Sequence, residues 1–145
     1  MPTAITKGDI FETKGIHAYA FGANIDGTMD AGIAIAMKKR WPELAAAFAA
    51  RCEGGKLTLG DAFMWTSTPE ATGATPEQPL TVFALAIRNG EKKASMSALT
   101  HAVRRMLALA AEAKLKRIGL PRIGGGPDGL DWTRVRKMLG EISVG

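Results

Sequence analysis

The stretch that decides the fold runs from residue 16 to residue 33 and reads IHAYAFGANIDGTMDAGI. Its first part, 16–21, is small or apolar almost without interruption, which is typical of a strand buried inside a covered sheet. From Asp30 onward the apolar residues take helical spacing, with Ile33 and Met37 on one side and cations in the last turn. The pattern therefore predicts a buried strand, a glycine-bearing turn that starts at residue 22, and a helix.

A second turn of the same kind lies at 121–132 and reads PRIGGGPDGLDW. It follows the predicted strand 117–120 and precedes a predicted helix. Exposed N–H groups at a helix start attract phosphate, and glycines let a ligand approach the backbone closely. Because ligands bind at the carboxyl ends of the strands in open α/β sheets, two such turns would hold a diphosphate between them. The alternative is that the three consecutive glycines only form a tight turn.

The rest of the chain alternates between the periods of strands and helices. The predicted strands are 5–8, 16–21, 62–66, 80–87 and 117–120, and the predicted helices are 30–40, 42–50, 96–113 and 132–142. The stretch 67–79 holds three prolines and no apolar period, which predicts a loop between two strands. Strands alternating with helices predict an α/β sheet with helices on both faces.

The composition is that of a single soluble globular domain over residues 1–145, with 46% hydrophobic and 23% charged residues. Cys52 is the only cysteine, and His17 and His101 lie far apart in the sequence. We therefore expect neither a disulfide framework nor a metal site, and no cofactor. The first residues resemble neither a signal peptide nor a membrane span, so we expect a cytoplasmic protein without a membrane partner.

The formal net charge of +5 raises the question of nucleic-acid binding. The basic residues come in small groups at expected helix ends or outer faces: Lys38-Lys39-Arg40, Arg104-Arg105, Lys114 with Lys116-Arg117, and Arg134 with Arg136-Lys137. Such scatter favours solvated helix faces, and a nucleic-acid surface remains the alternative.

Three common nucleotide or nucleophile motifs do not account for the chain. Gly124, Gly126 and Gly129 match G-x-G-x-x-G, but a dinucleotide-binding unit needs a further strand with an acid about 20 residues on, for which too little sequence follows. Neither a phosphate-binding G-x-x-x-x-G-K-[ST] loop nor a G-x-S-x-G serine turn occurs.

Taken together, the motifs resemble those of the macro domain, the ADP-ribose-binding module. The resemblance spans nearly the whole chain, through KGDI at 7–10, GAN at 22–24, MDAGIA at 29–34 with KKR at 38–40, and LPRIGGG at 120–126 continuing to LDW at 130–132. The MxAGIA run and the PRIGxGxxxLxW ending resemble the branch of the terminal ADP-ribose protein glycohydrolase and bacterial antitoxins that remove ADP-ribose from DNA.

The resemblance implies a three-layer α/β/α sandwich with a mixed central sheet. It also implies a ligand, ADP-ribose, and residues that contact it: Asp9, Ile10, Asn24, Ala31, Gly32, Ile33, Ala34, Ile123, Gly124, Gly125, Gly126 and Pro127. Asp9 would accept a hydrogen bond from the adenine amine, and the two glycine loops would hold the diphosphate. Asn24 and Asp128 would reach the distal ribose as catalytic residues, with Asp128 as the acid/base. Asp9 and Asn24 could instead have structural roles: Asp9 as a turn or N-cap carboxylate, and Asn24 as an amide that caps a loop.

Two positions depart from the branch. Asp30 stands where glycine is usual, and a carboxylate there would repel an anion at the helix start. The hydrolases of the branch use a lysine near the end of the strand before the long helix, where this chain has Arg88. An arginine stays protonated and is no nucleophile, while Lys92 and Lys93 come a few residues late and are typical of solvated side chains.

These features predict a monomeric protein that binds ADP-ribose and hydrolyses its ester or glycosidic link to protein or nucleic acid. The first alternative is a reader module that binds ADP-ribose without turnover, which the missing lysine favours. The second alternative is a nucleic-acid-binding domain, which the net charge favours.

Overall fold

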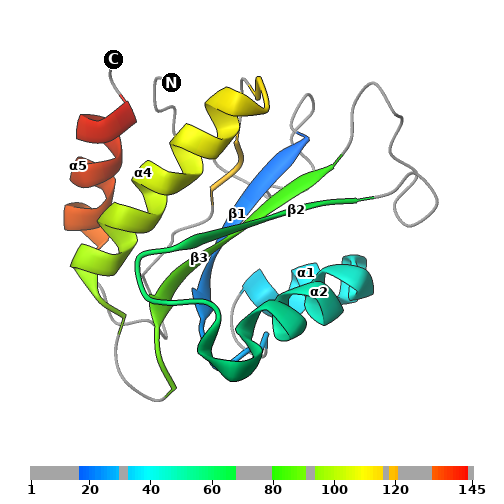
Figure 1. The fold of residues 1–145 in the computed structure, drawn as a ribbon. Coiled ribbons are helices and arrows are strands. Elements are labelled where there is room, and N and C mark those ends of the chain that lie inside the picture. Colours follow the sequence, from blue (N-terminus) through cyan, green and yellow to red (C-terminus); the bar gives the residue numbers. More distant parts are fainter. Residues whose placement is uncertain are drawn as a thin grey trace.

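The computed structural model describes residues 17–29, 33–67, 80–90, 94–115, 118–120 and 132–143. The elements follow in the order β1 (Ala18–Asn24), α1 (Ile33–Arg40), α2 (Pro42–Cys52), the 3-10 turn η2 (Glu53–Gly55), β2 (Ala62–Thr66), β3 (Thr81–Arg88), α4 (Met96–Glu112) and α5 (Trp132–Ser143). Helices α1 and α2 cover one face of the sheet, and α4 and α5 cover the other (Figure 1). The predicted three-layer α/β/α arrangement is confirmed.

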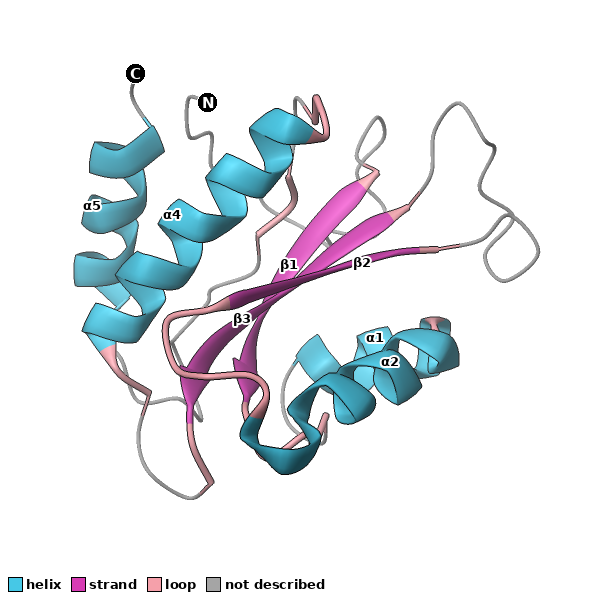
Figure 2. Cartoon of the chain, viewed as in Figure 1, coloured by secondary structure: helices cyan, strands magenta, loops and turns pink. Residues whose placement is uncertain are grey.

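The sheet is mixed, with β3 between its two neighbours in the order β1-β3-β2. β1 runs parallel to β3, and β2 runs antiparallel to it (Figure 2). On the other side of β1, Gly119 forms a parallel bridge with Tyr19. The carboxyl ends of β1 and β3 therefore meet at one edge of the sheet, and the segment around Gly119 runs in the same direction beside the start of β1.

β3 is buried on both faces because it lies in the middle of all three layers. Residues 81–87 are all buried, and their side chains alternate between the two cores. Val82, Ala84 and Ala86 join the core under α1 and α2, whereas Phe83, Leu85 and Ile87 join the core under α4 and α5.

The core under α1 and α2 is built around aromatic rings. Phe48 of α2 packs edge-on against Phe21 of β1, with 5.9 Å between ring centroids, and also contacts Phe63 of β2 at 6.3 Å. Trp41 precedes α2 and packs on Tyr19 at 5.8 Å. Such rings bury large apolar areas, so this core anchors α2 to the sheet.

The core under α4 and α5 is aliphatic. Leu99, Val103 and Met106 form one apolar side of α4, and Val135 of α5 joins them. β1 presents only small residues such as Ala20 to this core, which leaves room for two helices side by side. Both cores thus follow from the alternation of large and small residues along β1.

The end of β1 differs from the prediction. The strand was expected over 16–21 with a turn starting at Gly22, but it runs to Asn24. Gly22 pairs with Leu85 and Ala23 with Ala86, so the ladder with β3 overrides the turn tendency of glycine and asparagine.

Other boundaries agree to within a few residues. β2 coincides with the predicted strand, β3 begins and ends one residue later than predicted, α4 ends one residue earlier, and α2 continues to Cys52. Of the predicted strand 117–120, the described part forms only the bridge at Gly119. The predicted strand 5–8 and loop residues 68–79 lie outside the described residues, although Ser67 N–H donates to the Leu80 carbonyl at 2.8 Å and so joins the two ends of that loop.

Candidate functional site

Two parallel strands leave the sheet at one edge. The chain continues there from Asn24 of β1 to α1 and from Arg88 of β3 to α4, and the segment that runs parallel to β1 at Gly119 precedes α5. The edge at which parallel strands lead into helices is where ligands bind in α/β sheets. Both glycine-bearing turns predicted from the sequence belong to these segments.

The side chain of Asn24 joins the segments that follow β1 and β3. Its Nδ2 donates to the Gly90 carbonyl at 2.8 Å, and its Oδ1 accepts from the Gly90 N–H at 2.9 Å. Oδ1 also accepts from the Asp26 N–H at 3.1 Å. The structure therefore shows the loop-capping interpretation of Asn24, while its contact with a ribose stays a prediction.

Gly90 is suited to this contact by its backbone conformation. Its φ of +63° is one that L side chains rarely adopt, and space around its α-carbon is open. Arg88 Nε donates to the same carbonyl at 3.1 Å, and the Arg88 carbonyl accepts from the Ile25 N–H at 2.9 Å. The turns after β1 and β3 are thus fixed to each other by three hydrogen bonds, and the Arg88 side chain adds a fourth within the turn after β3.

The start of α1 carries two residues predicted to contact the diphosphate or the ribose. Ile33 is half-buried, and Ala34 is buried against the core that contains Met29 and Met37. The side chain of Ala34 therefore packs inward, and a ligand at this position would meet the backbone. This agrees with a site in which amides contact phosphates.

The start of α4 is close to the end of β3. Ser95 N–H donates to the Ile87 carbonyl at 2.9 Å, and the Ser95 hydroxyl caps the helix by accepting from the Ala98 N–H at 3.1 Å. The segment from Arg88 to Ser95 is therefore tied at both ends, and it carries the two lysines at 92 and 93.

Most of the residues predicted for the site lie outside the described residues. These are Asp9, Ile10, Asp30, Ala31, Gly32, Lys92, Lys93, Ile123, Gly124, Gly125, Gly126, Pro127 and Asp128. Their roles stay predictions. Asn24, Ile33 and Ala34 are the predicted ligand-binding residues that the structure places, and all three lie at the same edge of the sheet.

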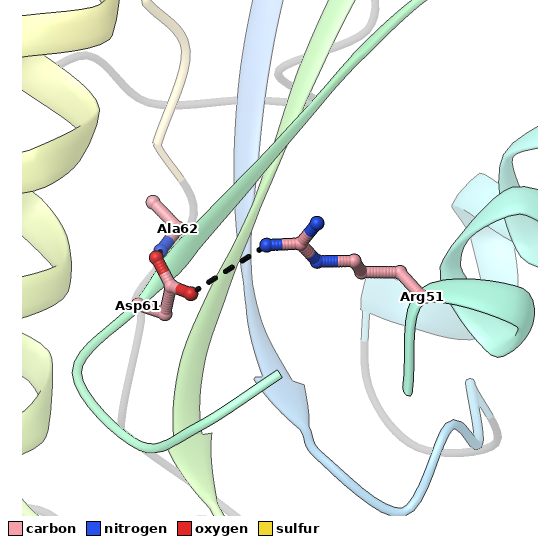
Figure 3. Close-up of polar contacts among 3 residues, drawn as sticks. All are labelled: Arg51, Asp61 and Ala62. Carbon is pink, nitrogen blue, oxygen red and sulfur yellow. Dashed lines mark hydrogen bonds and ion pairs between the residues drawn. The ribbon is translucent and has the colours of Figure 1, made fainter. Parts of the chain in front are cut away.

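An ion pair supports this edge from β2. Arg51 in the last turn of α2 lies 3.9 Å from Asp61, whose other oxygen accepts from the Ala62 N–H at 2.9 Å (Figure 3). The two side chains are 48% and 31% exposed, so water weakens their attraction. The hydrogen bond to Ala62 fixes the start of β2 more firmly than the ion pair does.

Cys52 does not supply a nucleophile to the site. It is buried at the end of α2, and burial raises the pKa of its thiol, with the charge of Asp26 adding to the rise and Arg51 opposing it. A thiol with a raised pKa stays protonated at neutral pH and is a weak nucleophile.

Two other kinds of feature, a metal site and a membrane-spanning helix, are not found among the described residues. No group of three or more His, Cys, Asp or Glu side chains within these ranges could hold a metal ion. Among the helices of the same ranges, none has the length and apolar character to cross a membrane.

The sequence did not predict that Arg88 and Gly90 form hydrogen bonds with the turn after β1. The available signal was the Asn89-Gly90 dipeptide, which is typical of a turn with positive φ after a strand. That signal locates the turn but cannot name Asn24, its partner 66 residues away.

Nearly the whole arrangement of strands and helices is also covered by the sequence model of a known family. The model of the Macro domain matches residues 21–139, which include every described element except the first residues of β1 and the end of α5. The chain belongs to the macro domain family. A relative from Thermus aquaticus, named a DNA ADP-ribosyl glycohydrolase, is 25% identical over 136 residues, covering 93% of this macro domain and 36% of that protein. The chain thus spans about a third of the length of the curated relatives it matches.

Solved structures share the same fold. The macrodomain of Thermus aquaticus DarG superposes with a TM-score of 0.80 at 24% identity, covering 93% of this macro domain and 85% of that chain. The complex of Thermosipho africanus DarTG with ADP-ribose gives a TM-score of 0.78 at 19% identity, covering 91% and 36% of the two chains. These likenesses confirm the macro domain fold, and the name of the curated relatives agrees with the branch that the sequence motifs resemble.

Proposed function

We propose that this macro domain binds ADP-ribose at the edge where β1 and β3 end, and that it hydrolyses the link between ADP-ribose and an acceptor. The observation that carries the proposal is that two parallel strands, each followed by a helix, end side by side at one edge of the sheet. The name of the Thermus aquaticus relative and the ADP-ribose in the Thermosipho africanus structure support it.

The proposed contacts are those the family resemblance implies. Asp9 and Ile10 hold the adenine, the loops at 31–34 and 123–127 hold the diphosphate, and Asn24 and Asp128 lie toward the distal ribose. The amides of the loops would offset charge on the phosphates. We also propose that the protein acts as a monomer. We place it in the cytoplasm because its single cysteine fits a reducing compartment.

Asp128 is the proposed acid/base. It would orient or deprotonate a water molecule that attacks the ribose carbon, while the diphosphate contacts hold that carbon in place. A positioned acid/base contributes about 100-fold or more, so Asp128→Ala should lower turnover by that factor and leave ADP-ribose affinity nearly unchanged.

One observation favours a second function, a reader that binds ADP-ribose without turnover. β3 ends at Arg88, where the hydrolases of the branch have a lysine nearby, and the Arg88 Nε donates to the Gly90 carbonyl. A guanidinium engaged in this way cannot form a covalent ribose adduct.

Calorimetry with ADP-ribose tests the binding proposal. We expect micromolar or tighter affinity, about −8 kcal/mol. Gly32→Glu should abolish binding because its side chain would occupy the diphosphate site, whereas Ala46→Glu on the exposed face of α2 should bind normally. Asp30→Gly should raise affinity by removing a negative charge at the start of α1. A wild-type protein that gives no heat with ADP-ribose or related nucleotides would contradict the proposal.

Turnover assays separate the hydrolase from the reader. The substrates are ADP-ribose linked to a nucleobase, to a carboxylate ester, to an O-acetyl group and to a 1″-phosphate. If water is the nucleophile, the double variant Lys92→Ala/Lys93→Ala should retain its rate; if a lysine forms an adduct, turnover should vanish. Tight ADP-ribose binding with no turnover of any substrate would support the reader.

A further inference from the structure

Helices α4 and α5 carry five exposed cations on the outer side of the molecule. Arg104 and Arg105 lie on α4, and Arg134, Arg136 and Lys137 lie on α5. Their neighbours Val103, Met106, Val135 and Met138 are buried toward the sheet, so the cations face solvent. We name these five residues the α4–α5 basic surface. The two helices lie side by side (Figure 1).

The cations of this surface form no ion pair with any other residue that the structure describes. Arg104, Arg105 and Arg136 also have no acidic residue three or four positions away in the sequence, where helical neighbours lie. Surface cations that serve only solubility are commonly interspersed with acids. Three of the five cations thus lack an acidic helical neighbour, whereas Asp131 stands three positions before Arg134 and Glu141 four positions after Lys137.

Helix stability does not explain the positions of the α5 cations. Cations stabilise a helix near its C-terminus and disfavour it near its N-terminus, yet Arg134 lies in the first turn of α5 and its last turn contains no basic residue. α1 shows the stabilising arrangement, with Lys38, Lys39 and Arg40 in its last turn. The cations of α1 are therefore accounted for by the helix itself, and those of α5 are not.

The α4–α5 basic surface begins at the proposed binding edge. α4 and α5 both start beside the edge where β1 and β3 end, and both run back along the sheet (Figure 1). At 1.5 Å per residue, Arg134 and Lys137 lie within about 8 Å of the first residue of α5 along its axis. A chain attached to a ligand at this edge can therefore reach these cations first and those of α4 next.

We propose that the α4–α5 basic surface binds the phosphodiester backbone of a DNA strand whose ADP-ribose group occupies the site. A nucleic-acid strand carries one negative charge per nucleotide at regular spacing, so it can meet several cations spread over two helices at once. An ADP-ribosylated protein offers no such regular series of charges. This inference rests on the proposed function and adds to it a surface of this chain that contacts the backbone of the acceptor.

Matched charge-removing variants test the proposal. Arg134→Gln/Lys137→Gln removes two cations near the site, Arg104→Gln/Arg105→Gln removes two farther along α4, and Lys38→Gln/Lys39→Gln removes two exposed cations from α1 as the control. Each variant changes the net charge equally, and every replaced side chain is exposed, so folding should persist. Circular dichroism and the thermal midpoint verify this.

The first readout is the binding of a fluorescent, unmodified single-stranded oligonucleotide at low salt, which does not depend on catalysis. The α5 variant should bind about fivefold or more weakly than wild type, with a salt slope smaller by about 1.4, since each phosphate contact contributes about 0.7. The α4 variant should lose less of its affinity for the oligonucleotide, and the affinity of the α1 variant should be unchanged. Equal losses in the α1 and α5 variants would overturn the proposal.

The second readout compares kcat/KM for an ADP-ribosylated oligonucleotide with that for an ADP-ribosylated mononucleoside, which lacks the backbone. The α5 variant should lose about fivefold or more on the oligonucleotide alone. Equal loss on both substrates, or equal loss on an ADP-ribosylated protein, would overturn the proposal. If wild type turns over no substrate, the proposed hydrolysis fails while the oligonucleotide-binding result still decides whether the surface exists.

Discussion

The two helical layers of this macro domain are built by different means. The layer of α1 and α2 is held by aromatic contacts of Phe48 and Trp41, and its basic group lies where the helix dipole favours it. The layer of α4 and α5 is held by aliphatic side chains, and α5 carries Arg134 in its first turn, where the dipole disfavours a cation. The first layer is therefore explained by stability alone, whereas the second carries charge that stability does not require.

Truncating the aromatic core should have the largest effect on stability. Phe48 is fully buried and contacts both Phe21 and Phe63. Phe48→Ala should lower the free energy of unfolding by about 4 kcal/mol, because it removes a large apolar surface and leaves a cavity. Leu99→Ala in the other layer should cost about 3 kcal/mol. Urea denaturation measures both, and a larger loss for Leu99→Ala would reverse the comparison.

Breaking the contact that joins the turns after β1 and β3 should have the next largest effect. Asn24→Ala removes both hydrogen bonds to Gly90 and leaves the N–H groups of Gly90 and Asp26 without their acceptor, which should cost about 2 kcal/mol. Asn89→Ala, exposed in the same turn, is the control. In the same urea titrations, a loss no greater than that of the control would show that the turn is held by Arg88 alone.

Reversing single charges sharpens the comparison between α1 and α5. Lys39→Glu should lower the free energy of unfolding by about 0.5 kcal/mol, and Arg134→Glu should raise it by about the same amount, because the two residues lie at opposite ends of their helix dipoles. Both variants change the net charge equally. Unfolding midpoints at low and high salt measure the effects, which should shrink as salt screens them. Shifts of the same sign would contradict the dipole argument.

The ion pair between α2 and the start of β2 should contribute least. The atoms of Arg51 and Asp61 are 3.9 Å apart and the side chains are partly exposed, so their coupling should be below about 0.5 kcal/mol. A double-mutant cycle with Arg51→Ala and Asp61→Ala measures it. Coupling well above that value would mean that the first layer also depends on electrostatics.

The elements with strong periodicity could be predicted from the sequence. The apolar run of β3 and the helical spacing of Leu99, Val103 and Met106 each fix an element type with little ambiguity. The end of β1 could not be predicted, because Gly22 and Asn24 favour a turn locally and only the ladder with β3 extends the strand. Local propensity yields to pairing in such cases.

The candidate site, like the fold, could be predicted from the sequence only in part. Its position follows from topology, since strands that feed helices predict a binding edge at their carboxyl ends. The hydrogen bonds from Asn24 to Gly90 could not be foreseen, because they depend on β1 and β3 being neighbours in the sheet although far apart in the chain. The sequence motif did identify Asn24, through a resemblance rather than through this contact.

The burial of β3 also has a consequence for the nascent chain. The strand reads TVFALAIR, and its first seven residues are uncharged and contain no proline, a composition prone to intermolecular β-aggregation when unpaired. Its parallel partner β1 lies far upstream, beyond two helices and β2, and such non-local pairing forms slowly. Arg88 ends the run with a charge that disfavours stacking of identical strands. The residue that helps to hold the turn in the native fold thus also acts as a gatekeeper before that fold exists.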